Sequence, residues 1–260
     1  MTNTRKQIKA IAKARISKQR YTAILTQVFV ILAGIPFLLF VYRQHIPFVP
    51  DDGYVFLIVV LVFEILIAVP VYVNSYGIDI KIFHQERASI KDIFLNFHKN
   101  YFNKIAGMVL RWLLISLCFI FVALTVFIPH FRSIVFILIG GIISIVVGTF
   151  VSITLSMVPF ILADCPNVSA KKALSISQRM TDGYELELFI LGLSFFWWYL
   201  PMSIIIAVIP DLLLGFLLSL IYLAVFLIPY RATTYAGYYS ELWASAINSG
   251  TVSASEFQQG

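Results

Sequence analysis

The chain alternates long apolar runs with short polar stretches, and each run is long enough to cross a hydrocarbon core of about 30 Å. Such runs are helical in lipid, because every backbone amide must find its hydrogen bond within its own segment. The pattern therefore predicts an all-α, polytopic membrane protein with six transmembrane helices in one membrane domain, residues 22–248. The expected spans are residues 22–42, 54–73, 105–128, 133–162, 188–209 and 212–228.

Basic residues gather in the polar segments on one side of these spans. The N-terminal segment, residues 1–21, contains seven basic side chains and no acidic one. Its apolar residues recur at helical spacing, which predicts an amphipathic helix lying on the membrane; retention of the N-terminus by charge alone is the simpler interpretation. Because basic loops stay on the cytoplasmic side, we expect both termini and the amphipathic helices of the polar loops to be cytoplasmic.

The chain is organised around residues 157–195, which leave one span, form a polar helix and enter the next span. The helix is expected at Ser169–Thr181, with a turn at Asp182-Gly183. Its basic side chains are expected to meet anionic lipid headgroups at the inner face, or alternatively a protein partner. These side chains are Lys171, Lys172 and Arg179. The Ser- and Gln-rich end, residues 249–260, is expected to be disordered.

Composition supports the membrane assignment. Sixty per cent of the 260 residues are hydrophobic, 12% are charged, and the mean hydropathy is +0.90. Soluble domains have about 45–50% apolar and about 25% charged residues. The net charge of +6 is explained by the basic cytoplasmic segments, so no nucleic-acid partner is expected.

Small residues recur at every fourth position of the fourth span. Such rows let helix backbones approach closely, so this span is expected to be the central packing helix of the bundle. Hydroxyl groups lining a polar path are the alternative. The row consists of Gly140, Ser144, Gly148, Ser152 and Ser156. In the fifth span, an aromatic cluster at 195–199 precedes Pro201 and predicts a kink.

Glu64 lies near the middle of the second span, and Arg111 lies within the third. A carboxylate at that depth costs about 2.5–3.5 kcal/mol on insertion scales, so it should face the bundle interior. Three interpretations stay open: a structural pair between Glu64 and Arg111, a protonated and hydrogen-bonded Glu64, or a proton or substrate site. These two residues are the candidate intramembrane polar site.

No catalytic, cofactor-binding or metal-binding residues are predicted. The four histidines are scattered over loops without metal-ligand spacing, and no phosphate-binding loop or nucleophile elbow occurs. We therefore expect a protein that is not an enzyme.

The central stretch resembles the signature of a bacterial integral membrane family catalogued as domain of unknown function 975. The matching positions are Asp164, Pro166, Ala173, Leu174, Ser177, Met180, Gly183, Phe189, Leu191, Leu193, Ser194 and Phe195. A looser similarity extends to the membrane domain attached to some glycerophosphodiester phosphodiesterases. One departure is Tyr184-Glu185, where such proteins often carry a basic pair. The resemblance implies a six-helix protein of the bacterial cytoplasmic membrane and supplies no activity.

Together these observations favour a non-enzymatic scaffold or modulator of envelope or lipid processes. The alternative is a small transporter or permease subunit that uses Glu64 and the fourth span. Expected partners are membrane lipids with anionic headgroups, and either further copies of the chain or another membrane protein.

Overall fold

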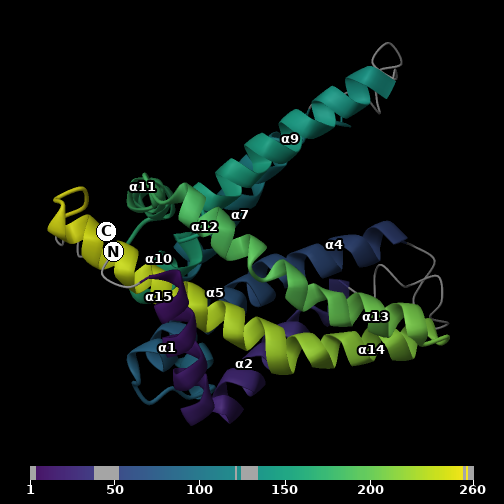
Figure 1. Ribbon diagram of the computed structural model, residues 1–260, viewed down its shortest axis with the longest axis horizontal. Coiled ribbons are helices and arrows are strands. Elements are labelled where there is room, and N and C mark those ends of the chain that lie inside the picture. Colours follow the sequence, from purple (N-terminus) through teal and green to yellow (C-terminus); the bar gives the residue numbers. More distant parts are fainter. Residues whose placement is uncertain (1–3, 38–52, 121, 124–133, 254–255, 257–260) are drawn as a thin grey trace.

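The computed structural model describes residues 4–37, 53–120, 122–123, 134–253 and 256. Over this part of the chain the protein is all-helical, which confirms the all-α part of the prediction. Among the described residues, five helical segments are long and apolar enough to cross a membrane (Figure 1). They are Arg20–Phe37, Tyr54–His84, Ile137–Asp164, Glu185–Val208 and Leu214–Asn248.

These segments are built from α-helices and from short turns of other helix types, labelled η. The elements are α1 (Arg5–Lys18), α2 (Arg20–Ala33), α4 (Gly53–Phe63), η2 (Glu64–Ala68), α5 (Val69–His84), α6 (Lys91–Leu95), α7 (Tyr101–Leu117), α9 (Ile134–Thr154), α10 (Val158–Asp164), α11 (Ala170–Thr181), α12 (Glu185–Leu193), η4 (Phe196–Tyr199), α13 (Leu200–Val208), α14 (Leu212–Tyr222), η5 (Leu223–Leu227) and α15 (Ile228–Asn248). The predicted third span, residues 105–128, begins within α7, and its residues 121 and 124–128 lie outside the described part of the chain.

Four of these helical segments are interrupted, and in each a proline lies at the start of the helix that follows the interruption. Each proline occupies one of the first two positions of α5, α10, α13 or α15: Pro70, Pro159, Pro201 and Pro229. Proline lacks an amide hydrogen, and its ring clashes with the carbonyl four residues earlier, so the regular helix is interrupted. The wider turns η2 and η5, the tighter turn η4 and a turn at 155–157 take up these interruptions. The fourth span is therefore two helices, whereas one was predicted, and the kink predicted in the fifth is confirmed.

Two helices run well beyond the ends that hydropathy predicts. The second span was expected to end at Val73, but α5 continues to His84. The sixth was expected to end at Ile228, but α15 continues to Asn248. The two extensions pack against each other, and several of their polar residues are buried, which explains why the helices continue although the sequence becomes polar. These buried residues are Asn74, Ser75, Asp79, Thr233 and Thr234.

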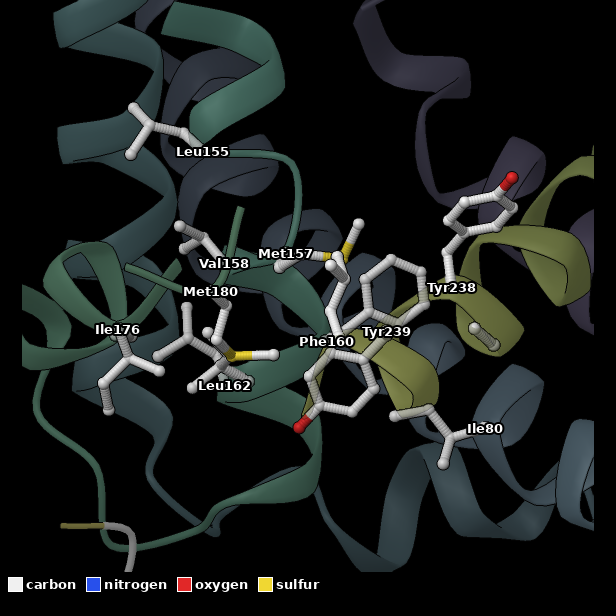
Figure 2. Packing of buried hydrophobic residues seen from close by; sticks show 14 of the residues in the cluster. Ile80, Leu155, Met157, Val158, Phe160, Leu162, Ile176, Met180, Tyr238 and Tyr239 are labelled. Atoms are coloured by element: carbon white, nitrogen blue, oxygen red, sulfur yellow. The ribbon is translucent and has the colours of Figure 1, made fainter. Parts of the chain in front are cut away.

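The main hydrophobic core lies where the extended helices meet α10 and α11. Phe160 of α10 stacks on Tyr239 of α15, with 5.5 Å between ring centroids, and meets Tyr76 of α5 edge-on at 4.5 Å. Figure 2 shows the rings of Phe160 and Tyr239 beside Met157, Leu162 and Met180. This core joins segments far apart in sequence at the end of the molecule where α1, α11 and the end of α15 lie, which we call the basic end.

Two groups of helices diverge from this core (Figure 1). One arm consists of α7 and α9, which contact each other. The other arm contains α2, α4, α13 and α14. The helix α9 was predicted to be the central packing helix of the bundle, but it forms the edge of the first arm, and many of its apolar side chains are exposed. Such exposure is expected of a surface that faces lipid.

The terminal segments are more closely packed than the sequence predicts. Ile8 and Ala12 of α1 are buried, and α1 packs against α15 and α5, so these residues contact protein on the face predicted to lie on the membrane. Lys9 Nζ donates a 2.5 Å hydrogen bond to Ser194 Oγ. The tail from residue 249 was predicted to be disordered, yet Val252 is buried and its amide donates to the carbonyl of Ala246.

Candidate functional site

A cavity of about 730 Å³ lies between the two arms, where they leave the core. One wall is built from α7 and α9, and the facing wall from α5, α12, η4 and α15. Most of the surface is apolar, but the ionisable residues Asp79, Arg111 and Arg231 line it together. The cavity is therefore a largely apolar space, within the candidate spans, that contains ionisable side chains.

Arg231 lies on α15, two residues after the proline that begins this helix. Its Nη1 donates a 2.9 Å hydrogen bond to the hydroxyl of Tyr199, and its guanidinium lies 5.7 Å from the ring centroid of Tyr235. Both contacts are with uncharged groups, and they orient the guanidinium. The side chain remains exposed, so a ligand entering from the open side can reach it.

Arg111 projects from α7 into the same cavity, from the other arm. It is half-buried, and its Nε is buried without a hydrogen-bond partner. No ion pair among the described residues involves Arg111 or Arg231. A buried, unsatisfied donor on a charged group is costly, which makes Arg111 a strong candidate for contact with an anion.

The small-residue row of α9 contributes to the same wall. Ser144 and Gly148 are buried, and a methyl group at Gly148 would meet the ring of Phe119 at 3.2 Å, so this part of the row packs closely. Gly148, Ser152 and Ser156 also line the cavity, whereas Gly140 is half-buried and lies outside it. The row thus combines the two interpretations left open by the sequence, since its members serve helix packing and also form a cavity wall.

The cavity contains polar groups on α5 that sequence reasoning missed. Tyr72 and Tyr76 hydrogen-bond to each other through their hydroxyls, and both line the cavity with Asp79. Asp79 is only 1% exposed, and neither carboxylate oxygen has a hydrogen-bond partner among the described residues. The spacing of residues 72, 76 and 79 could have revealed this group, because it places all three on one face of a helix. It was missed because the second span was predicted to end at Val73, before two of these residues.

Glu64 lies in η2 and does not line this cavity. It forms no ion pair with Arg111, and its Oε1 is buried without a hydrogen-bond partner. Its carboxylate lies near the backbone of Phe37, at the end of the first span. The predicted pair between Glu64 and Arg111 is therefore wrong, because η2 places the carboxylate toward the first span instead of α7.

The three basic residues of α11 have different surroundings. Lys171 is exposed and Lys172 is half-buried. Arg179 pairs with Glu256 in the C-terminal segment, with 2.5 Å between Nη2 and Oε2. The turn that follows this helix has the predicted glycine, Gly183, with φ of +78°. Of the three residues, Lys171 is the most accessible to a headgroup.

The cavity resembles sites for amphiphiles in its chemistry: apolar walls accommodate a chain, and two guanidinium groups can bind an acid group by paired hydrogen bonds. Of the residues that the structure describes, no group of three or more His, Cys, Asp or Glu side chains lies close enough to hold a metal ion.

The comparisons with known proteins give one positive result. The model of a family described as "Protein of unknown function (DUF975)" matches residues 1–246. No curated protein and no solved structure matches the chain.

Proposed function

The chain belongs to the DUF975 family of proteins of unknown function, and on that premise we propose that it is an integral membrane protein that binds an acidic membrane amphiphile. The acid group of the amphiphile, a phosphate or carboxylate, is bound between Arg111 and Arg231. The apolar part lies along α9 and the ring of Tyr199 in η4. The protein acts in this proposal as a modulator of lipid or envelope processes, with its basic end in the cytoplasm.

The observation that carries the proposal is the placement of two arginines on opposite walls of a largely apolar cavity, neither of them in an ion pair with a described residue. An uncompensated cation in a low-dielectric space is expensive, and an anionic ligand reduces that cost. An arginine binds phosphate or carboxylate oxygens through two parallel hydrogen bonds, which favours an acid group over a neutral headgroup. The apolar walls favour a ligand with a chain over a free anion.

The test is binding of fluorescent lipids to the purified full-length protein in neutral detergent. Phosphatidic acid and phosphatidylcholine with the same labelled chain are compared by fluorescence anisotropy. We expect phosphatidic acid to bind at least tenfold more tightly. Arg111→Gln and Arg231→Gln should each reduce this preference by about tenfold, since each removes a charge-assisted contact worth about 1.5–3 kcal/mol.

The matched control is Arg87→Gln, because Arg87 is exposed and lies outside the cavity. This variant should bind phosphatidic acid as the unmodified protein does. Equal affinity for the two lipids, or equal losses in all three variants, would overturn the proposal.

A transporter that uses Glu64 for coupling has less support, because Glu64 does not line the cavity. We further propose that the protein binds its lipid without chemical conversion. Incubation of the labelled lipid with the protein, followed by thin-layer chromatography, tests this; a new labelled product would replace the binding function with a catalytic one.

A further inference from the structure

A second cavity of about 550 Å³ opens on the other side of α5, toward the basic end. It is bounded by α5, α6, α7, α10 and α15. Opposite faces of α5 thus line the two cavities: Tyr76 and Asp79 face the first, while Asn74 and Lys81 face the second. The second cavity is distinct in position and in chemistry, since most of its polar residues carry charge.

One end of this cavity contains a buried lysine. Lys104 is 2% exposed, and its Nζ donates hydrogen bonds to Asn74 Oδ1 at 2.6 Å and to the carbonyl of Asn96 at 2.9 Å. Asn74 is itself oriented by a hydrogen bond from its Nδ2 to the carbonyl of Ile93. Both acceptors are uncharged, although an ammonium group carries three donors. Burial, and then the nearby Lys99, lower the pKa of Lys104 to about 8.

The other end of the cavity is acidic. Asp164 ends α10, and its Oδ2 accepts a 3.0 Å hydrogen bond from the hydroxyl of Tyr239. Glu86 lies close enough to interact electrostatically with Asp164, as does His84. The ring of Trp243, which is in contact with Tyr239, forms part of the same wall. An aromatic wall beside carboxylates is suited to an ammonium group.

Two further charged residues that line this cavity neutralise each other. Lys81 pairs with Asp92 at 2.9 Å, on the wall that α5 and α6 form. Neither Lys104 nor Asp164 has an ion-pair partner among the described residues. The cavity therefore has a cationic end and an acidic end that the protein does not pair with each other.

We propose that this cavity binds a small zwitterion, with its acid group at Lys104 and Lys99 and its ammonium group at Asp164 and Glu86. The hydrogen bonds to Asn74 and Asn96 hold Lys104 in place before the ligand arrives, which reduces the entropy lost on binding. A molecule with only one charged group satisfies one end of the cavity. This site is independent of the cavity between the arms, because the two proposed ligands are bound by different residues.

The test is isothermal titration calorimetry of the full chain in lipid nanodiscs, with a series of ω-amino acids from glycine to 5-aminovalerate. We expect at least one member to bind ten times more tightly than the acid and the amine of equal chain length. Lys104→Met and Asp164→Asn should each weaken that binding by about tenfold or more. Lys13→Met, at an exposed lysine outside the cavity, should leave it unchanged.

Nanodiscs with and without phosphatidylethanolamine distinguish a free ligand from a lipid headgroup with the same charges. Binding in both discs identifies a soluble zwitterion, and binding abolished by phosphatidylethanolamine identifies its headgroup as occupant; both results support the site. The proposal is overturned if no ω-amino acid exceeds its singly charged analogues. This comparison uses the unmodified protein, so it remains decisive even where Lys104→Met fails to fold.

Discussion

Arg179 of α11 and Glu256 form an ion pair with 2.5 Å between Nη2 and Oε2, which ties the C-terminal segment to the helix. Arg179 Nη1 also donates to the carbonyl of Thr251 at 3.0 Å. The buried Val252 lies between these contacts in sequence. The arginine that the sequence assigns to lipid headgroups is therefore engaged by the chain's own tail.

Loss of this pair should release the tail while leaving the helical core intact. Both side chains are about one-third exposed, so the pair contributes about 0.2–1 kcal/mol. In Glu256→Gln we expect faster hydrogen exchange at residues 249–253, measured by mass spectrometry, and unchanged exchange in α11. Lys171→Gln, at an exposed residue of the same helix, is the control and should leave tail exchange unchanged.

The same pair gives the tail a defined acid sensitivity. Hydrogen bonding to Arg179 lowers the pKa of Glu256 from its ordinary 4.5 to about 2. A carboxylate whose pKa is lower in the folded state stabilises that state fully above pH 4.5, and its contribution is lost as pH falls toward 2. Tail exchange, corrected for intrinsic rates, should therefore be constant from pH 7 to 5 and should increase below 4.5. A profile identical to that of Glu256→Gln would contradict this.

The contact between α15, α5 and α1 depends on a glycine. A Cβ at Gly237 would lie 2.5 Å from the ring of Phe83 and 2.8 Å from Ile8, whereas a Cβ at Gly141 meets nothing within 4 Å. Gly237→Ala should therefore lower the free energy of unfolding by about 1–3 kcal/mol through overpacking. Gly141→Ala should be neutral or slightly stabilising. Thermal unfolding in detergent compares the two, and equal melting temperatures would refute the close approach.

Glu64 and Arg111 should behave independently. They form no ion pair, and of the two only Arg111 lines the cavity between the arms. In a double-mutant cycle with Glu64→Gln and Arg111→Gln, the effects on unfolding should add within about 0.5 kcal/mol. Glu64→Gln alone should leave folding largely intact. A coupling energy above 1 kcal/mol would restore the structural pair that the sequence suggests.

The helices could be predicted from the sequence because their signal is local: apolar runs such as residues 54–73 and 188–209 have no alternative in lipid. Their ends could not, because the polar halves of α5 and α15 are stabilised by each other, and hydropathy does not report such contacts. The row from Gly140 to Ser156 was recognised, yet the position of α9 at the edge of an arm depends on how the chain turns at 155–157.

The candidate sites were predictable only in part, for a related reason. Arg111 was identified because a charge within a span is conspicuous. Arg231, Asp79 and Lys104 lie near the ends of apolar runs, where charged residues are common, so nothing local marked them. What brings Arg231 to Arg111 and Lys104 to Asn74 is the tertiary packing of helices far apart in sequence.

The zwitterion site should lose affinity as Lys104 loses its proton. Its pKa of about 8, below its ordinary 10.5, means that the charged form predominates at pH 7 and the neutral form at pH 9. The other titratable groups lining this cavity are Lys81, His84, Glu86, Asp92, Lys99, Asp164 and Tyr239. If the acid group of the ligand requires protonated Lys104, Kd should be flat from pH 6.5 to 7.5 and about tenfold higher at pH 9. The pH dependence of Kd is measured by calorimetry for the unmodified protein and for Lys104→Met with the same ω-amino acid. This comparison separates the titration of Lys104 from that of the ligand. The variant should bind weakly with no additional step near pH 8, and the same step in both proteins would show that another group is responsible.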